Sequence, residues 1–316
     1  MKGHVYFIDP LEKLNIRKDS TLMLALTGLK MGLESYVIFS SDLYFSNQNQ
    51  ESLRVYTFAG DFSKEGYYLE SFVLGQSKQI SFSQVAYLHM RIDPPFDSRY
   101  LRFLWVLQEL KKKGLVVLND SQGILLHNEK LAAYSHPLSH ASFVGGAGQA
   151  ALDFLKNLKQ QGYSDFILKP LDLYQGMGVQ KFSWNDDLKK LLEDKEHEFG
   201  GMLVLQPYIK AVESGELRSI YFDGEHLGSI IKVPPSGSYL ANIAQGATYA
   251  AIEPSTAVAG ICKSIATELQ KDGVRLIAYD ILDEKISEVN VTCPGLLVEV
   301  SKACKRDLAQ EILQRI

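Results

Sequence analysis

The chain has 316 residues, 46% of them hydrophobic and 22% charged, with a formal net charge of -4. This composition is typical of a soluble globular enzyme of two domains, and its slight acidity argues against a nucleic-acid partner. The apolar run before Asp9 is too short for a signal peptide, and no stretch of about 18 apolar residues predicts a membrane span. The cysteines, Cys262, Cys293 and Cys304, are odd in number and lack CxxC spacing, which favours free thiols in a reducing cytoplasm.

The first third of the chain predicts a β-α-β start. Residues 4–9 are predicted to form a buried strand, Asp19 to cap a helix that ends before Gly32, and residues 34–40 to form a second strand. This order predicts an open α/β layer. Residues 41–82 are expected to form shorter strands and turns.

A stiff loop follows the next predicted strand, residues 85–92. Its sequence, Asp93-Pro94-Pro95-Phe96-Asp97, holds two prolines, which stop a strand and restrict the backbone. Open α/β sheets bind ligands at the carboxyl ends of their strands, so this loop is a candidate ligand site. We then expect a helix at 98–113, a strand at 116–119 and a domain boundary near 120–127.

Two familiar nucleotide-binding loops are absent from the sequence, G-x-x-x-x-G-K-[ST] and a G-x-G-x-x-G after a first strand. Lysine side chains such as Lys130 and Lys169 are an alternative, because each supplies charge and flexible donors to phosphates. Lys169 lies in an apolar run and is the stronger candidate, since a lone lysine in a strand usually extends to solvent. Glycines in the loop at 172–178 would let backbone N–H groups approach phosphate. Residues 202–209 read as an apolar strand.

The C-terminal half predicts further antiparallel strands. Residues 218–222 and 226–233 are predicted to form a hairpin, because the intervening Asp-Gly is a strong turn sequence. The loop at 234–248 is rich in Gly, Ser and Pro, and we expect it to be mobile. Helices are expected at 255–272 and at 302–314.

Two more strands, residues 276–282 and 285–292, are predicted to be joined by a tight turn. Such a turn would place Asp280 opposite Glu288, with Asn290 on the same face because side chains alternate along a strand. Two carboxylates and an amide oxygen suit Mg²⁺, which is usually completed by substrate phosphates and water. The alternative is a surface hairpin whose acidic residues face water.

The same residues stand in a pattern that resembles a known family. Asp280, the run EVNVT at 288–292 and Pro294 look like the D…E-[IV]-N-[VT]-[TS] signature of ATP-grasp ligases, in the form found in bacterial glutathione synthetase. The segments MRIDPPFD, NEKL and LKPLD are similar to segments of that family and occur in the same order. The resemblance implies an α/β chain with an ATP-grasp fold preceded by an N-terminal open α/β domain.

The implied domains are an N-terminal, substrate-side domain at 1–122 and an ATP-grasp domain at 123–316. Within the second domain, the resemblance implies a lid at about 130–205 and a catalytic core at about 206–316. The boundary between the domains would fall in the segment that the sequence pattern already singles out.

The resemblance also implies roles for individual residues. Those for the metal are Asp280, Glu288 and Asn290. Those for ATP are Lys130, Lys169, Gly176, Gly178, Gln206, Tyr208, Ile209 and Glu216. Those for the acid substrate are Lys18, Ser20, Arg91 and Asp93, and those for catalysis are Arg218, Lys232 and Asn242. Alternatives stay open for Glu216, as a solvated turn carboxylate, and for Arg91, as an ion-pair partner of Asp93 or Asp97.

The segment around the predicted loop at 234–248 departs from the family pattern. Lys232 stands where the family has arginine, which keeps the charge but loses the planar fork. Leu240 and Thr248 stand at two further arginine positions, so the loop itself carries no positive charge. The glycine loop at 172–178 is also longer and has fewer glycines than the family pattern, whereas the metal triad and both lysines are intact.

The reaction implied by the resemblance is an ATP-dependent ligation of a carboxylate to an amine with Mg²⁺, or with Mn²⁺ in its place. ATP phosphorylates the carboxylate of γ-glutamylcysteine, and glycine attacks the acylphosphate to give glutathione, ADP and phosphate. The resemblance implies a cytoplasmic homo-oligomer with small-molecule substrates and no membrane partner. Two alternatives remain: a ligase for a different acid or amine, and a nucleotide-binding protein without turnover.

Overall fold

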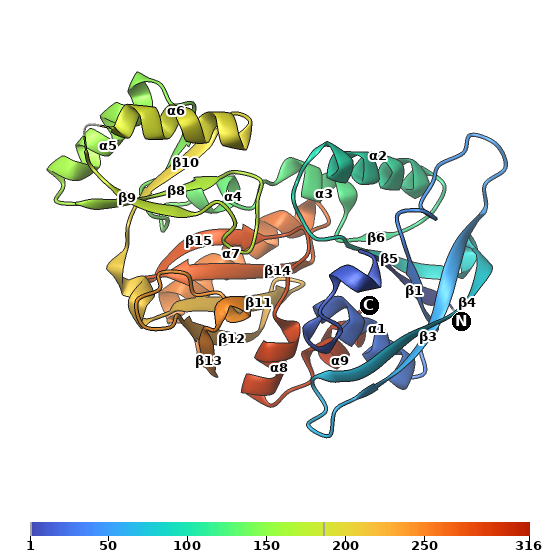
Figure 1. Ribbon diagram of the computed structural model, residues 1–316. Coiled ribbons are helices and arrows are strands. Elements are labelled where there is room, and N and C mark those ends of the chain that lie inside the picture. The colour runs from blue at the N-terminus through green and yellow to red at the C-terminus, as the bar shows by residue number, and fades with distance from the viewer. Residues whose placement is uncertain (1, 186) are drawn as a thin grey trace.

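The computed structural model describes residues 2–185 and 187–316, and it contains three β-sheets. Figure 1 shows the N-terminal sheet on the right, a small sheet at the upper left and a third sheet below it. They have six, four and five strands, respectively. Among the described residues, no helix is both long enough and apolar enough to cross a membrane.

The N-terminal sheet has the strand order β4-β3-β2-β1-β5-β6. Its strands are β1 (Gly3–Ile8), β2 (Ser35–Ile38), β3 (Ser52–Phe62), β4 (Leu69–Ser81), β5 (Val85–Arg91) and β6 (Val117–Leu118). Strands β2, β1, β5 and β6 pair in parallel, which confirms the predicted β-α-β start. Short 3-10 turns lie at Leu11–Lys13, Ile16–Lys18 and Phe82–Gln84.

Strand β1 is buried on both faces of the sheet. Val5 and Phe7 belong to the hydrophobic cluster of helix α2 (Ser98–Lys112), whereas Tyr6 and Ile8 belong to the cluster of helix α1 (Ser20–Lys30). A strand covered on both sides needs apolar residues at successive positions, which explains the run VYFI.

Helix α1 begins where the sequence predicts. The backbone N–H groups of Thr21 and Leu22 both donate to Asp19 Oδ1 at 2.8 Å. Such a cap satisfies N–H groups that have no partner within the helix. The cap fixes the start of α1 beside the ligand side of the sheet.

The expectation of shorter strands and turns for residues 41–82 is wrong. Two long strands lie there, β3 of 11 residues and β4 of 13 residues, and they form an antiparallel hairpin at the edge of the sheet. Most positions of β4 are exposed or half-buried. Its sequence therefore lacks the alternation that marks a strand with one face on a core.

The small sheet has the order β7-β10-β8-β9 and is covered by two helices. Its strands are β7 (Phe143–Gly145), β8 (Asp165–Pro170), β9 (Gln180–Ser183) and β10 (Leu203–Pro207). The covering helices are α5 (Gln149–Gln160) and α6 (Leu188–Phe199). Two short helices, α3 (Ser121–Leu126) and α4 (Leu131–Tyr134), lie between the first sheet and this one along the chain.

The third sheet is antiparallel throughout, with the order β13-β12-β11-β14-β15. Its strands are β11 (Glu216–Phe222), β12 (Glu225–Val233), β13 (Thr248–Ala251), β14 (Leu276–Leu282) and β15 (Lys285–Asn290). Both predicted hairpins are confirmed, and Asp280 pairs directly with Glu288. Strand β15 ends at Asn290 rather than at residue 292. Two 3-10 turns, Lys210–Ser214 and Ile243–Gln245, precede and follow the first hairpin.

Three helices pack on the third sheet or beside it. Helix α7 (Thr256–Lys271) confirms the predicted helix at 255–272. The single final helix expected at 302–314 is wrong, because the chain forms α8 (Leu297–Cys304) and α9 (Leu308–Leu313) instead. Lys305 adopts a left-handed conformation with φ of 55°, which ends α8, and the Asp307 side chain caps α9.

Asn119, just after β6, joins the first sheet to the third. Its Nδ2 donates to the carbonyl oxygens of Leu276 at 2.6 Å and Val291 at 2.9 Å. Its Oδ1 accepts from the N–H groups of Arg275 at 2.9 Å and Leu276 at 2.8 Å. The side chain is buried, and every donor and acceptor of its amide is used.

Candidate active site

A cavity of about 690 Å³ is lined by residues from all three sheets. It brings together the residues predicted to bind metal, ATP and acid substrate, and those predicted to act in catalysis. Gly178 is the exception, because it does not line the cavity. Residues that are distant in the sequence therefore meet at one site.

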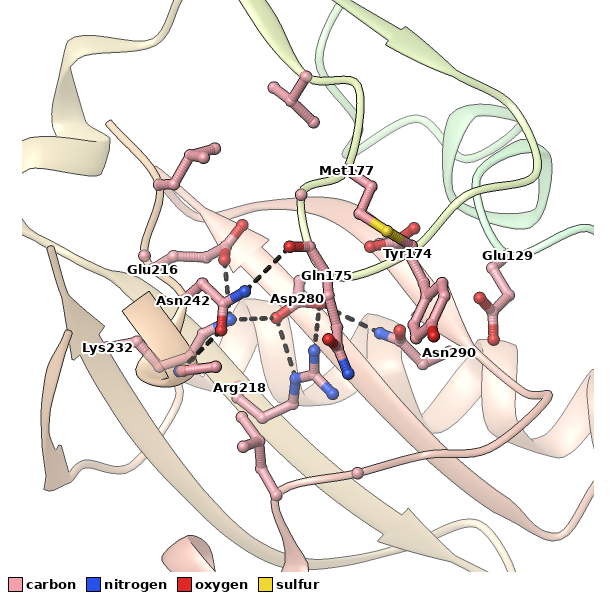
Figure 2. Close-up of a pocket in the computed structure, with 18 of the residues that line it drawn as sticks. Glu129, Tyr174, Gln175, Met177, Glu216, Arg218, Lys232, Asn242, Asp280 and Asn290 are labelled. Atoms are coloured by element: carbon pink, nitrogen blue, oxygen red, sulfur yellow. Dashed lines mark hydrogen bonds and ion pairs between the residues drawn. The ribbon is translucent and has the colours of Figure 1, made fainter. Parts of the chain in front are cut away.

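Strand β11 places two charged side chains on the cavity wall. In the sheet register, Arg218 lies opposite Asp280 of β14, and Glu216 lies opposite Lys232 of β12. Arg218 donates to Asp280 from Nε at 2.9 Å and from Nη2 at 2.6 Å. Lys232 donates to Asp280 at 2.7 Å and to Glu216 at 2.8 Å. Figure 2 shows Arg218 and Lys232 converging on Asp280.

The charges around Asp280 determine its protonation. Burial alone would raise the pKa of Asp280, but the positive charges of Arg218 and Lys232 hold that pKa well below its usual range. Burial raises the pKa of Glu216, although Lys232 opposes this. The alternative of Glu216 as a solvated turn carboxylate is wrong, since its side chain lies on a strand and binds Lys232.

Strand β15 places two oxygen-bearing side chains, Glu288 and Asn290, next to Asp280. Glu288 forms an ion pair with Lys130 at 3.1 Å. Asn290 donates from Nδ2 to Asp280 at 3.1 Å and to the Ala278 carbonyl at 3.0 Å, which directs its amide oxygen away from those two partners.

This donor set fits a hard cation that also binds phosphate. No group of three or more His, Cys, Asp or Glu side chains suited to a metal occurs within residues 2–185 and 187–316. Asp280 and Glu288 supply two carboxylates, and the Asn290 amide oxygen is a third ligand of the same kind. A Mg²⁺ site with few protein ligands relies on substrate phosphates and water for the rest of its shell.

The two lysines predicted to contact phosphates both line the cavity, but they differ in their hydrogen-bond and ion-pair partners. Lys130 Nζ donates to the Leu173 carbonyl at 2.8 Å as well as binding Glu288. Lys169 forms no ion pair within the described ranges, and its Nζ lies 5.6 Å from the centre of the Tyr134 ring. Burial lowers the pKa of Lys169, opposed by the nearby charges of the acidic residues. A half-buried lysine with no ion-pair partner among the described residues is suited to an anionic ligand.

Two loops meet at the cavity. Asn242, in the loop after β12, donates from Nδ2 to the Gln175 carbonyl at 2.9 Å, as Figure 2 shows. The same Asn242 accepts from Ala244 N at 2.9 Å, which caps the 3-10 turn. Leu240 lies beside Gly176, because a Cβ added there would be 3.6 Å from a Leu240 methyl carbon.

The two predicted phosphate glycines differ in role. Gly176 lines the cavity, with φ of +77°. Gly178 lies outside, and a Cβ added to it would come within 3.0 Å of Pro170 and 3.1 Å of Phe199. Its glycine is explained by close packing and by its φ of +72°, not by contact with the cavity.

The predicted nucleotide end of the cavity is formed by β10 and the residues that follow it. Gln206, Tyr208 and Ile209 all line it. Gln206 donates from Nε2 to Ser142 Oγ at 2.8 Å, and Lys181 Nζ lies 3.7 Å from the centre of the Tyr208 ring. These contacts hold the side chains of Gln206 and Tyr208 in place. The aromatic ring of Tyr208 and the side chain of Ile209 give this end of the cavity an apolar lining, which suits a flat base.

The predicted acid end lies at the carboxyl end of β5. The alternative ion pair of Arg91 with Asp93 or Asp97 is wrong, because Arg91 donates to Thr21 Oγ1 at 2.8 Å and to the Pro294 carbonyl at 2.9 Å. Arg91 is thus held by neutral acceptors. Burial raises the pKa of Asp93 to about 6.

Ser20 and Lys18 flank the N-cap of α1 at this end. Ser20 Oγ accepts from Leu297 N at 3.0 Å, which ties the start of α1 to the start of α8. Lys18 ends the preceding 3-10 turn and lines the cavity.

Several cavity residues escaped the sequence prediction. Figure 2 shows Tyr174, Gln175 and Met177 in the loop above Asp280, and all three line the cavity. Their position in the predicted loop at 172–178, with Met177 between the two glycines and Tyr174 and Gln175 just before the first, is the available signal. Glu129 was also missed, although it precedes Lys130 in the NEKL segment; its Oε1 accepts from Thr292 N at 2.9 Å and Oγ1 at 2.7 Å.

Comparison with protein families gives two matches along the chain. The N-terminal domain of prokaryotic glutathione synthetase matches residues 3–124, and the ATP-grasp domain of the same family matches residues 129–305. The glutathione synthetase of Shewanella oneidensis is 26% identical over 316 residues, which cover 98% of this chain and 96% of that protein. That of Parasynechococcus marenigrum is 27% identical, covering 99% of this chain and 98% of that protein.

Solved structures share the fold at lower identity. D-cycloserine synthetase DcsG has a TM-score of 0.67 at 15% identity, covering 99% of both chains. D-alanine–D-alanine ligase from Bacillus anthracis, complexed with ATP, has a TM-score of 0.57 at 15% identity, covering 99% of this chain and 96% of the ligase. The ATP-grasp ligase PsnB, complexed with Mg and ADP, has a TM-score of 0.58 at 15% identity, covering 99% of this chain and 97% of that chain. These similarities show the ATP-grasp fold.

Proposed function

The chain belongs to the prokaryotic glutathione synthetase family of ATP-dependent ligases that form C–N bonds, and we propose that its acid substrate is γ-glutamylcysteine and its amine glycine. In this reaction a carboxylate oxygen of the acid attacks the γ-phosphorus of ATP, and ADP leaves. The amine nitrogen then attacks the acyl carbon, phosphate leaves and the nitrogen loses a proton.

The observation that carries the proposal is the clustering of four cations around the predicted metal carboxylates. Arg218 and Lys232 bind Asp280, Lys130 binds Glu288, and Lys169 lies nearby without an ion pair among the described residues. Such an array suits a polyphosphate, because each cation can exchange a carboxylate for a phosphate oxygen. The acid end of the cavity then presents Arg91 and Lys18 to a carboxylate.

The chain's own side chains supply most of the mechanism. We assign Lys130 and Lys169 to ATP phosphates, and Arg218 and Lys232 to the negative charge that develops on the transferring phosphoryl group. Asn242 and Gln175 hold the two loops together over the reaction, which excludes water from an acylphosphate that water would hydrolyse.

We assign the metal to Asp280, Glu288 and the amide oxygen of Asn290. When bound, Mg²⁺, or Mn²⁺ in its place, would neutralise phosphate charge. We expect Glu288→Gln to weaken Mg·ATP binding, measured by calorimetry at fixed ATP with increasing MgCl₂. Unchanged binding and turnover in that variant would rule out this ligand set.

The same family membership supports a cytoplasmic homo-oligomer with small-molecule substrates. Sedimentation of the purified protein would test the oligomeric state.

A second candidate is a ligase that uses a different amine. It is favoured by two neutral residues at positions where the family pattern has arginine: Leu240, which lines the cavity, and Thr248, at the start of β13. A neutral loop offers no ion pair to the carboxylate of glycine, so an amine without a carboxylate becomes a competitor.

One assay separates these functions. ADP release is measured with Mg·ATP and γ-glutamylcysteine, alone and with a panel of amino acids and simple amines, and products are identified by mass. ADP release that requires both γ-glutamylcysteine and glycine supports the proposal, whereas preference for another amine supports the second candidate. ATP binding with no ADP release under any condition would instead leave a nucleotide-binding protein without turnover.

A further inference from the structure

Glu299 is a buried acid, and one of its two carboxylate oxygens has no hydrogen-bond partner among the described residues. It lies in the first turn of α8, and only 2% of its surface is exposed. Its Oε2 has no hydrogen-bond partner among the described residues. Buried carboxylates are almost always paired, because an uncompensated charge loses its hydration. An exception needs an explanation in function.

Three other acids of the cavity wall bind cations. Asp280 binds Arg218 and Lys232, Glu216 binds Lys232, and Glu288 binds Lys130. Among acidic side chains in the described part of the chain, Glu299 alone has a buried oxygen left without a hydrogen bond. Arg218, Lys232 and Lys130 are thus engaged with other carboxylates, and Glu299 retains an acceptor for a group from outside the protein.

The position of Glu299 is fixed by the surrounding structure. Val298 and Val300 on either side are fully buried, and the start of α8 is held by the hydrogen bond from Leu297 N to Ser20 Oγ. Glu299 lines the same cavity as Lys18 and Arg218. Burial raises the pKa of Glu299, while the charges of Lys18 and Arg218 oppose the rise. Glu299 thus shares the cavity with Lys18 of the predicted acid end and Arg218 of the predicted phosphoryl-transfer end.

We propose that Glu299 receives the ammonium group of a substrate. The inference rests on the proposed function, since both substrates of that reaction carry such a group. An ammonium group brings a positive charge and three N–H donors, which an unpaired buried carboxylate lacks. The group is either the α-ammonium of the γ-glutamyl acid or the amine that later attacks, and both sources share this chemistry.

The test compares Glu299→Gln with a matched variant, Glu65→Gln. Glu65 is an exposed acid in the turn between β3 and β4, and it does not line the cavity. It binds Lys302 of α8, the helix that carries Glu299, at 2.7 Å. Both substitutions keep the shape and remove one charge. We expect Glu299→Gln to raise the KM for its ammonium substrate about ten- to hundredfold, the factor for loss of one charge-assisted hydrogen bond. Glu65→Gln should change it less than twofold.

Hydroxylamine distinguishes the two sources of the ammonium group. It is mostly uncharged at neutral pH and traps the acylphosphate as a hydroxamate. If the acid supplies the ammonium group, Glu299→Gln raises the KM for γ-glutamylcysteine with either glycine or hydroxylamine. If the amine supplies it, only the KM for glycine rises and hydroxamate formation is kept. Unchanged KM values for both substrates would overturn the proposal, even if kcat falls.

Direct binding separates this inference from the proposed function. Calorimetry on wild-type protein with Mg²⁺ and a non-hydrolysable ATP analogue would compare γ-glutamylcysteine with its desamino analogue, and would titrate glycine separately. If wild-type protein prefers γ-glutamylcysteine to the desamino analogue and Glu299→Gln loses this preference, Glu299 binds the ammonium group of the acid. If Glu299→Gln instead loses the binding of glycine, Glu299 binds the ammonium group of the amine. The assignment fails if wild-type protein binds neither γ-glutamylcysteine nor glycine. It also fails if the Glu299→Gln variant binds both substrates as tightly as wild-type protein does. Absent ADP release with γ-glutamylcysteine would refute only the proposed function.

Discussion

Asn242 donates a hydrogen bond to the backbone carbonyl of Gln175 across 2.9 Å and so joins two loops that are far apart in the sequence. Its other amide atom, Oδ1, caps the 3-10 turn of its own loop. One side chain thus both shapes a loop and attaches it to another. Separating these two effects tests whether the loops act as one lid.

We expect Asn242→Ser to lower kcat by up to about tenfold, the scale of one neutral hydrogen bond. Serine keeps a capping oxygen but is too short to reach the other loop. Gln175→Ala is the control, because the contact uses the backbone carbonyl and should survive. Faster amide exchange in residues 234–248 should accompany the lower kcat in Asn242→Ser. Equal kinetics in both variants would show that the bond between the loops is dispensable.

Leu240→Arg should raise kcat more than it changes ATP affinity. Leu240 lies beside Gly176 at the cavity, so an arginine there can reach charge that develops during transfer. Leu240→Met, which adds length without charge, is the matched control. Arg218→Lys should have the opposite effect and cost about 10²-fold, the scale of one preorganised donor. Flat turnover in Leu240→Arg together with tolerance of Arg218→Lys would place the phosphoryl-transfer site elsewhere.

Lys169→Met should reduce ATP affinity by about 1–3 kcal/mol, because it removes a buried charge-assisted bond to phosphate. The same change should not destabilise the ATP-free protein, since it replaces a half-buried charge by an apolar chain of similar length. The pKa of Lys169 is lowered by burial, so the folded protein binds this proton more weakly than the unfolded chain does. The stability advantage of the variant should therefore shrink as pH rises. Calorimetry and urea unfolding at two pH values measure both effects, and unaltered ATP affinity in the folded variant contradicts the role.

The buried pair of His4 and His89 should make stability depend on pH. Their ring nitrogens lie 3.0 Å apart, and burial lowers the pKa of both. As pH falls below about 6.5, the unfolded chain takes up protons that the folded protein does not bind, so the free energy of unfolding should decrease. The slope is at most about 1.4 kcal/mol per pH unit for each histidine. His89→Phe should flatten it in urea unfolding between pH 7.5 and pH 5, and an identical slope in that variant would exclude the pair as its source.

The sequence predicts the hairpin of β14 and β15 because a short turn joins the two strands. The two-residue turn sets Leu282 opposite Lys285 and Ile281 opposite Ile286, but the pairing of Asp280 with Glu288 also needs a one-residue register shift between Asp280 and Ile281. The partners of Asp280 were beyond this reasoning. Arg218 and Lys232 reach it from β11 and β12, and the order of strands in a sheet depends on the whole fold.

Other features depend on contacts that no local pattern encodes. The hairpin of β3 and β4 is largely exposed, so its residues carry little periodicity. Glu299 reads as an ordinary helical acid, and its place on the cavity wall that Lys18 and Arg218 also line depends on segments that are distant in the sequence. The sequence predicts Gly178 as a phosphate contact, whereas in the structure it does not line the cavity and packs against Pro170 and Phe199.

The side-chain amide of Asn119, whose donors and acceptors are all hydrogen-bonded, restricts which parts of the molecule can move during a catalytic cycle. Because the first and third sheets share its four hydrogen bonds, we expect them to behave as one rigid body. Opening is then left to the small sheet with α5 and α6. Spin labels on α2 and α7 should keep their separation when ATP binds, whereas labels on α6 and α7 should approach each other; a change in the first distance would contradict this. Arg91 and its Pro294 contact lie on the rigid body, so the acid end should keep its shape while nucleotides exchange, and ADP release and acid release become separate kinetic events.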